Sequence, residues 1–160
     1  MTPGESHNRR WIAMIGVAAL SGLAVFGAML WRAVSIETQA SARAHERFDT
    51  IRAMFPSAPP LVRRDASGRF VKTGASGRDA SSPARRLHVL AYHASTGRLV
   101  SADVPIWFIR IKGPAAALAL RGTGFDLEAL GLTAGDLERS GAGLVLDESR
   151  GEDALLAWTR

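Results

Sequence analysis

The sequence contains no cysteine, which excludes disulfides, thiolate catalysis and cysteine metal ligands. Lysine is almost absent as well, because only Lys72 and Lys112 accompany the 18 arginines. A Ser–Lys hydrolase needs a lysine that is desolvated by an apolar pocket. Lys72 stands in a polar stretch, so this class of enzyme is not expected.

Histidine and acidic residues form no recognisable catalytic or metal-binding pattern. His88 and His93 are five residues apart on an expected strand, which places their side chains on opposite faces. His45 is expected on a solvated helix face. An acidic loop near the C-terminus, without the spacing of an EF-hand, is expected to hold Asp147, Glu148, Glu152 and Asp153. We therefore predict no catalytic, cofactor-binding or metal-binding residues and no enzymatic activity.

Nucleotides and nucleic acids are not expected as partners. A phosphate-binding loop joins a strand to a following helix, whereas the glycine-rich turn at 141–143 follows an expected helix and precedes a strand. The arginines are scattered, and few aromatic residues lie among them, unlike the pattern of a nucleic-acid interface.

One long stretch lacks charge altogether. The 21 residues Trp11–Trp31 carry no charged side chain, and a helix of this length spans about 31 Å, close to the hydrocarbon thickness of a bilayer. Arg9, Arg10 and Arg32 flank the stretch, and the two tryptophans stand where indole rings favour the membrane interface. The pattern predicts a transmembrane helix at 11–31 after an N-terminal tail at 1–10.

The apolar stretch is longer than the core of a secretory signal, so an uncleaved anchor in the bacterial inner membrane is expected. Flanking positive charges are nearly balanced. We expect the N-terminus inside the cytoplasm and the C-terminal domain outside it, with the opposite topology left open. Small residues spaced by four, Ala18 with Gly22 and Ala24 with Ala28, also suggest a homodimer through this helix.

A helical stalk is predicted at 32–55. This stretch has no glycine or proline, and Ala44, Phe48, Ile51 and Phe55 recur at helical spacing. The stripe becomes polar toward the membrane, so a long coiled coil is not expected. We predict a polar stalk whose last two turns dock on the following domain.

Residues 56–160 are predicted to form a small α+β domain built on an antiparallel sheet of five or six short strands. Expected hairpins join 61–62 to 70–71, 87–93 to 98–104, and 144–146 to 154–158, and 73–85 is expected to be a mobile loop. Two short helices are expected before the final hairpin, at 126–130 and from the capping residue Thr133. Residues 105–111 fit either a strand or a helix.

Charge and aromatic residues are unevenly distributed. Residues 32–112 hold fourteen basic and six acidic side chains, a net charge of +8, whereas residues 113–160 carry −4. A basic half beside the membrane suits anionic headgroups, although such asymmetry also serves solubility. Trp107, Phe108 and Trp158 are expected in the core. The alternative for Trp107 and Phe108 is an apolar face that meets a partner or the bilayer.

Two stretches resemble a known group of proteins: RLHVLAYHASTGRLVSADVPIWFIRI and LGLTAGDLERSGAGLVLDESRGEDALLAWTR. The motifs at 105–107, 136–139 and 141–147, together with the apolar stretch, resemble small single-pass bacterial membrane proteins that have no assigned activity. The resemblance covers the predicted anchor and residues 86–160. It implies a bacterial single-pass protein and assigns no functional residue.

These observations predict a membrane-anchored, non-enzymatic interaction or accessory module of the bacterial cell envelope. Its expected partners are the bilayer, through Trp11–Trp31, and an unknown envelope protein. The alternative is a domain that binds a lipid or another small ligand at the membrane surface. An apolar pocket against the sheet, lined by Trp107 or Phe108, would favour that alternative.

Overall fold

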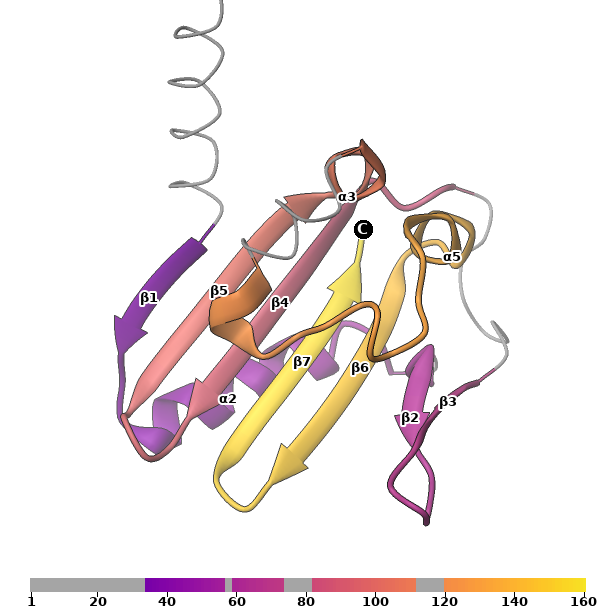
Figure 1. Cartoon of the computed structure of the whole chain (residues 1–160). Coiled ribbons are helices and arrows are strands. Elements are labelled where there is room, and N and C mark those ends of the chain that lie inside the picture. The colour runs from indigo at the N-terminus through magenta and orange to yellow at the C-terminus, as the bar shows by residue number, and fades with distance from the viewer. Residues whose placement is uncertain (1–33, 57–58, 74–81, 112–119) are drawn as a thin grey trace, which may run out of the picture. The chain divides into compact units, whose positions relative to one another are not determined.

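The computed structural model describes residues 34–56, 59–73, 82–111 and 120–160. They form a small antiparallel-sheet domain with few helices (Figure 1). A five-stranded sheet has the order β1-β5-β4-β7-β6, and β2 and β3 form a separate two-stranded sheet. The strands are β1 (Val34–Thr38), β2 (Val62–Arg64), β3 (Phe70–Lys72), β4 (Arg86–His93), β5 (Arg98–Pro105), β6 (Gly143–Arg150) and β7 (Asp153–Thr159). The helices are α2 (Ser41–Arg52), α3 (Ile106–Ile111), the 3-10 helix η1 (Arg121–Thr123) and α5 (Ala134–Arg139).

The three predicted hairpins are confirmed by the strand pairing. β2 pairs with β3, β4 with β5 and β6 with β7, each antiparallel. β7 also pairs with β4, so the last strand lies between two neighbours inside the sheet. Residues 105–111, which fitted either a strand or a helix, form the helix α3 directly after β5.

The predicted fold class is wrong, because it places a helical stalk where the described residues begin with a strand. Residues Val34–Thr38 form the edge strand β1, which pairs antiparallel with β5, where the prediction placed a continuous helix. The β-branched residues Val34, Ile36 and Thr38 alternate along β1, and such residues fit an extended, pleated backbone. Residues Ala33–Arg160 form one compact unit, so this part of the chain belongs to the domain.

The helical pattern within that stretch is real but shorter than predicted. In α2, Ala44, Phe48 and Ile51 are buried, and Phe55 packs against the same cluster. The helix lies against one face of the sheet, behind it in Figure 1. There it covers a core that includes Leu90, Tyr92, Leu99, Leu144 and Leu156. The whole of α2 therefore packs on the sheet from its first turn, where the prediction docked only the last two turns of a stalk.

Several predictions concern parts of the chain that are not described. The tail 1–10, the apolar stretch 11–31, residues 74–81 of the predicted mobile loop and the run at 112–119 lie outside the described residues. Among the helices that the structure does describe, none is both long and apolar enough to cross a membrane.

The second face of the sheet is covered by the chain between 120 and 139, drawn in orange across the front of Figure 1. Leu120, Phe125, Leu130 and Leu137 from this segment are buried. α3 and α5 pack together where β5 ends and β6 begins. One face of the sheet is therefore covered by the long helix α2, and the other face is covered by short helices and turns.

The start of α5 confirms the predicted cap. The Thr133 hydroxyl accepts a hydrogen bond from the Asp136 N–H, and the Asp136 carboxylate accepts one from the Thr133 N–H. Lys72 also donates to this carboxylate at 3.1 Å. The Thr133 N–H and Lys72 hold the pKa of Asp136 well below its ordinary value of 3.8.

We expect Asp136→Asn to lower the free energy of unfolding at neutral pH by about 1 kcal/mol, because the carboxylate that accepts from Thr133 and Lys72 loses its charge. Because the folded pKa is depressed, the carboxylate stabilises the fold above pH 3.8 and loses this effect as the pH falls. Urea denaturation between pH 7 and acid conditions tests both points, since the asparagine variant should lose less stability on acidification than the parent (about one group's contribution). A variant with unchanged stability at neutral pH and a parent-like acid response would contradict the role of this carboxylate.

Candidate functional site

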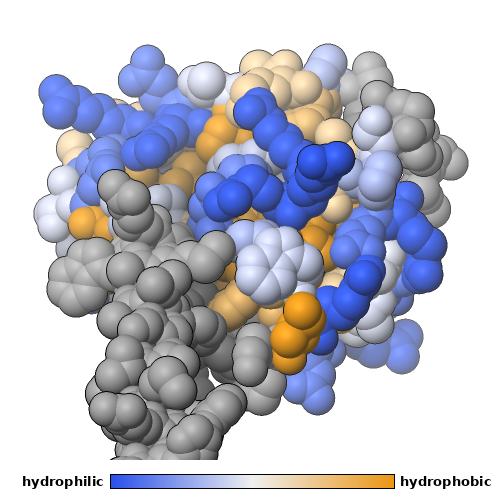
Figure 2. All heavy atoms as spheres, turned by 90° about the horizontal axis from the view of Figure 1, so that it is seen from above, coloured by the Kyte–Doolittle hydropathy of each residue, from blue (hydrophilic) through white to orange (hydrophobic). Residues whose placement is uncertain are grey.

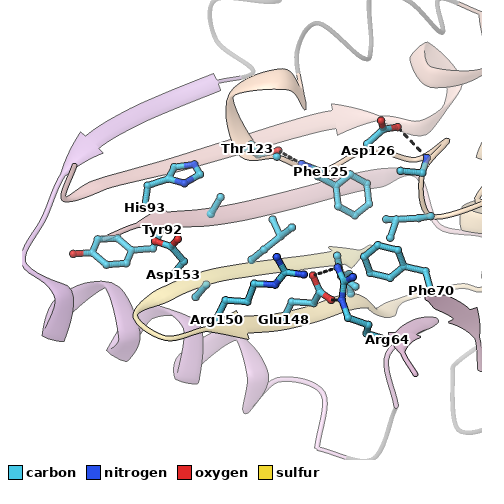
Figure 3. A pocket seen from close by; sticks show the side chains of 17 residues that line it. Arg64, Phe70, Tyr92, His93, Thr123, Phe125, Asp126, Glu148, Arg150 and Asp153 are labelled. Atoms are coloured by element: carbon cyan, nitrogen blue, oxygen red, sulfur yellow. Dashed lines mark hydrogen bonds and ion pairs between the residues drawn. The ribbon is translucent and has the colours of Figure 1, made fainter. Parts of the chain in front are cut away.

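An open cleft of about 310 Å³ lies on the sheet face opposite α2 (Figure 3). It is bounded by the β6–β7 hairpin, by the turn at 123–130 and by the β2–β3 hairpin. Its lining includes the apolar residues Phe70, Ala91, Phe125, Leu130, Leu146 and Leu155, and the ionisable residues Arg64, His93, Asp126, Glu148, Arg150 and Asp153. The site is therefore an apolar depression with a charged rim.

The floor of the cleft follows from the register of three neighbouring strands. Ala91 of β4 lies opposite Leu155 of β7, and Leu155 lies opposite Glu148 of β6. Directly opposed residues of an antiparallel sheet share a face, so these side chains form one row across the sheet. Ala91 itself is buried, so the partly exposed Leu155 forms the accessible part of this row.

The turn at 123–130 forms a rigid wall. The Thr123 hydroxyl donates to the Leu120 carbonyl at 2.7 Å and accepts from the Phe125 N–H at 3.1 Å. Gly124 has φ +73°, a left-handed conformation that glycine adopts at low cost. The Asp126 carboxylate accepts from the Glu128 N–H at 2.9 Å and so caps the next turn. These contacts hold the buried Phe125 against the sheet beside the cleft.

An ion pair joins the β2–β3 hairpin to the rim of the cleft. The Arg64 guanidinium donates to Glu148 at 2.7 Å and stacks over the Phe70 ring, 4.2 Å from its centroid. The Glu148 carboxylate raises the pKa of Arg64 above its ordinary value. Arg64 and Glu148 are therefore engaged with each other and serve to position the hairpin.

The remaining charges of the rim are not balanced. Asp126 caps its turn, and Asp153 accepts a hydrogen bond from the Ala94 N–H at 2.7 Å. By contrast, the side chains of Arg150 and His93 have no ion pair or hydrogen bond within the part of the chain that is described. Arg150 lies two residues after Glu148 on the same face of β6 and extends along the cleft in Figure 3. The rim therefore offers one unpaired guanidinium, beside two carboxylates, Asp126 and Asp153, that accept from backbone N–H groups and have no cationic partner among the described residues.

The prediction for the two strand histidines is confirmed. His88 and His93 lie on opposite faces of β4: His93 lines the cleft, whereas His88 stacks on Trp158 on the α2 side with a ring separation of 5.2 Å. Over the described ranges, no three histidine or acidic side chains gather where they could hold a metal ion.

The predicted acidic loop is wrong, because β6 continues through it to Arg150. Asp147 and Glu148 point to opposite faces of β6, and only Gly151 and Glu152 form the turn. Arg52 of α2 donates to Asp147 through two nitrogens, at 2.8 and 2.9 Å, and this contact raises the pKa of Arg52. Polar residues remain in strand conformation here because arginines distant in sequence pair with them.

The aromatic predictions have mixed outcomes. Phe108 is buried, as expected for the core. Trp158 is only partly buried against the α2-side cluster, and Trp107 is 52% exposed, so its assignment to the core is wrong. Neither Trp107 nor Phe108 lines the cleft. Phe70 and Phe125 take that place, and they come from segments whose proximity no local pattern in the sequence indicates.

His88 provides a pH-dependent contribution to stability. Burial lowers its pKa below the ordinary value of 6.5, and the nearby Asp103 opposes this effect only in part. Below pH 6.5 the unfolded chain binds a proton that the folded chain disfavours, so the free energy of unfolding should fall as the pH falls from that value. In His88→Gln this part of the pH dependence should disappear in urea denaturation. A variant that keeps the full dependence would show that His88 is not its source.

Comparisons with known proteins give no match: no family model, no curated protein and no solved structure is significantly similar to this chain. The resemblance to small single-pass bacterial membrane proteins therefore stays a prediction, and the interpretation of the site rests on its geometry.

Proposed function

We propose that this chain is a membrane-anchored, non-enzymatic binding module of the bacterial cell envelope whose cleft takes a small amphipathic anion. The observation that carries the proposal is the pairing of an apolar floor with an unpaired arginine, Arg150, at the rim. An apolar body would cover the partly exposed Leu155, and an anionic group would meet the guanidinium. This proposal combines the expected interaction module with the expected small-ligand alternative.

Size and charge both restrict the ligand. A volume of about 310 Å³ lies at the lower end of the range for small-molecule sites, so the ligand is a small molecule or one side chain of a protein partner. Arginine binds carboxylate or phosphate through paired hydrogen bonds. Arg150 would make these bonds without displacing another contact of its side chain among the described residues, and the anionic group would lie away from the rim carboxylates Asp126 and Asp153.

The proposed location in the cell rests on the sequence. The uncharged stretch Trp11–Trp31 would insert into the bacterial inner membrane, with the N-terminus inside the cytoplasm and the domain outside it. An envelope protein partner and a homodimer through the apolar stretch stay predictions.

To test the proposal, the full chain is reconstituted in zwitterionic nanodiscs and mixed with each member of a panel of fluorinated aromatic carboxylates. Binding is followed by fluorine NMR of the ligand. We expect a panel member to bind and Arg150→Glu to weaken its affinity roughly 10- to 100-fold, because a hydrogen bond to a charged group contributes about 1.5–3 kcal/mol. The matched control is Arg43→Glu, which makes the same charge change at an exposed position on α2.

The comparison between the two variants decides the outcome. Equal loss of affinity in Arg43→Glu and Arg150→Glu would show that only net charge matters and would contradict binding at the cleft. A second variant, Ala129→Trp, places a large ring in the cleft lining and should also prevent binding. No binding of any carboxylate by the folded parent would overturn the proposed ligand class.

A further inference from the structure

Two large apolar side chains are exposed on α3. Trp107 and Ile111 are 52% and 64% exposed, whereas Ile106, Phe108 and Ile109 of the same helix are buried. Residues four apart on a helix lie on the same side, so Trp107 and Ile111 form one exposed apolar patch. Exposed patches of this kind mark interaction surfaces more often than scattered single residues do.

Arginines surround this patch at the same end of the sheet. The Ile106 N–H donates to the Arg85 carbonyl at 2.9 Å, and the N–H groups of Arg85 and Arg86 donate to the Arg160 carbonyl at 2.7 and 2.9 Å. These contacts place three exposed arginines beside the start of α3. Figure 2 looks onto this end of the domain and shows strongly hydrophilic side chains next to apolar ones.

The charge of this end is positive after the ion pairs are counted. Asp103 binds Arg86 at 2.8 Å, and Glu138 binds Arg110. Arg85 and Arg160 have no acidic partner within the described residues, and the Arg160 guanidinium contacts only the Met54 sulfur at 3.0 Å. Two arginines therefore remain free to bind an anionic surface beside the apolar patch.

The described chain enters the domain at the same end of the sheet as α3, and this suggests a membrane surface as the partner of the patch. Val34 of β1 lies opposite Ala102 of β5, and β5 leads directly into α3. Only residues 32 and 33 separate Trp31 from Val34, and an extended chain covers at most about 3.6 Å per residue. If the stretch 11–31 inserts into the bilayer, the chain therefore leaves the membrane at most about 11 Å of extended chain before Val34.

We propose that this end of the domain docks on an anionic membrane surface, with Trp107 and Ile111 in the interfacial layer and Arg85 and Arg160 against lipid phosphates. The proposal rests on the anchoring that forms part of the proposed function. Tryptophan favours the membrane interface, and arginines near an anionic leaflet increase binding roughly fivefold each. The cleft residues His93, Arg150 and Asp153 lie at the opposite ends of their strands, so docking leaves the cleft open to ligand.

The absence of cysteine allows a site-specific probe on the full chain. Ile111→Cys carries an environment-sensitive fluorophore at the patch, and Ser95→Cys carries the same dye in the exposed β4–β5 turn at the other end. Each protein is reconstituted in vesicles of equal parts phosphatidylglycerol and phosphatidylcholine that contain a headgroup-level nitroxide lipid. We expect strong quenching at position 111, little at position 95, and a weaker signal at 111 in pure phosphatidylcholine.

Two docking variants, one control variant and an alkaline extraction distinguish failure of docking from failure of the anchor. Trp107→Glu, and Arg85→Glu combined with Arg160→Glu, should each reduce quenching at 111, whereas Arg43→Glu should not. Equal quenching at 111 and 95 in a chain that stays in the membrane after alkaline extraction would overturn docking and leave the anchor standing. If alkaline extraction removes the chain from the membrane although position 111 was quenched before extraction, the result would support docking and overturn the anchor.

Discussion

Replacing Phe48 by alanine should lower the free energy of unfolding by about 3–5 kcal/mol, the usual cost of removing a large buried aromatic side chain. Phe48 is fully buried and lies in the cluster that joins α2 to the sheet. The expected loss is large because the cavity would open between a helix and a sheet that cannot both move inward.

Urea denaturation of the full chain measures this effect, with Glu46→Ala on the exposed side of α2 as the control. The control should change the free energy of unfolding by less than about 0.5 kcal/mol. A Phe48→Ala variant as stable as this control would show that α2 behaves as a solvated stalk and does not belong to the folded unit.

The second large effect is expected on the other face of the sheet. Leu137 is the buried residue of α5 and is fully inaccessible to solvent. A helix of six residues is not stable alone, so its packing against α3 must hold it in place. We expect Leu137→Ala to lower the free energy of unfolding by about 2–5 kcal/mol.

The matched control is Arg139→Ala, which removes an exposed ion pair with Asp136 from the same helix. Exposed pairs contribute about 0–1 kcal/mol, so this variant should stay close to the parent in the same urea titration. If both variants lose equally little stability, the packing of α5 on the domain is not what stabilises this face.

Local patterns were sufficient for the elements that depend on neighbours in sequence. The three hairpins, the buried stripe of α2 and the Thr133 cap follow from periodicity and turn chemistry. They were predicted because the residues that stabilise them lie within a few positions of one another, or repeat at the spacing of one helix or strand.

The errors concern elements that depend on distant partners. β1 was interpreted as helix because the stretch has no glycine or proline, although Val34, Ile36 and Thr38 alternate as in a strand. That alternation is decisive only once β5 provides a partner. The second half of β6 was interpreted as a loop because it is polar. Asp147 and Glu148 stay in the strand because Arg52 and Arg64 pair with them.

The cleft could not be predicted from sequence patterns, because it too depends on residues that are distant in sequence. Its residues come from β2, β3, β4, β6, β7 and the turn at 123–130, and none of these segments alone carries a motif for ligand binding. Arg150 is one of several arginines without an acidic partner among the described residues, and only its place in the cleft lining, which the folded structure gives, distinguishes it.

The most direct test of the proposed function is a map of ligand binding on the backbone amides of the full chain in nanodiscs. An aromatic carboxylate that binds by fluorine NMR is titrated into isotope-labelled protein. We expect the largest shifts at Ala91, Phe125, Arg150 and Leu155, and none along α2. Shifts centred on the α2 face, or spread evenly over the exposed arginines, would contradict a ligand site in this cleft.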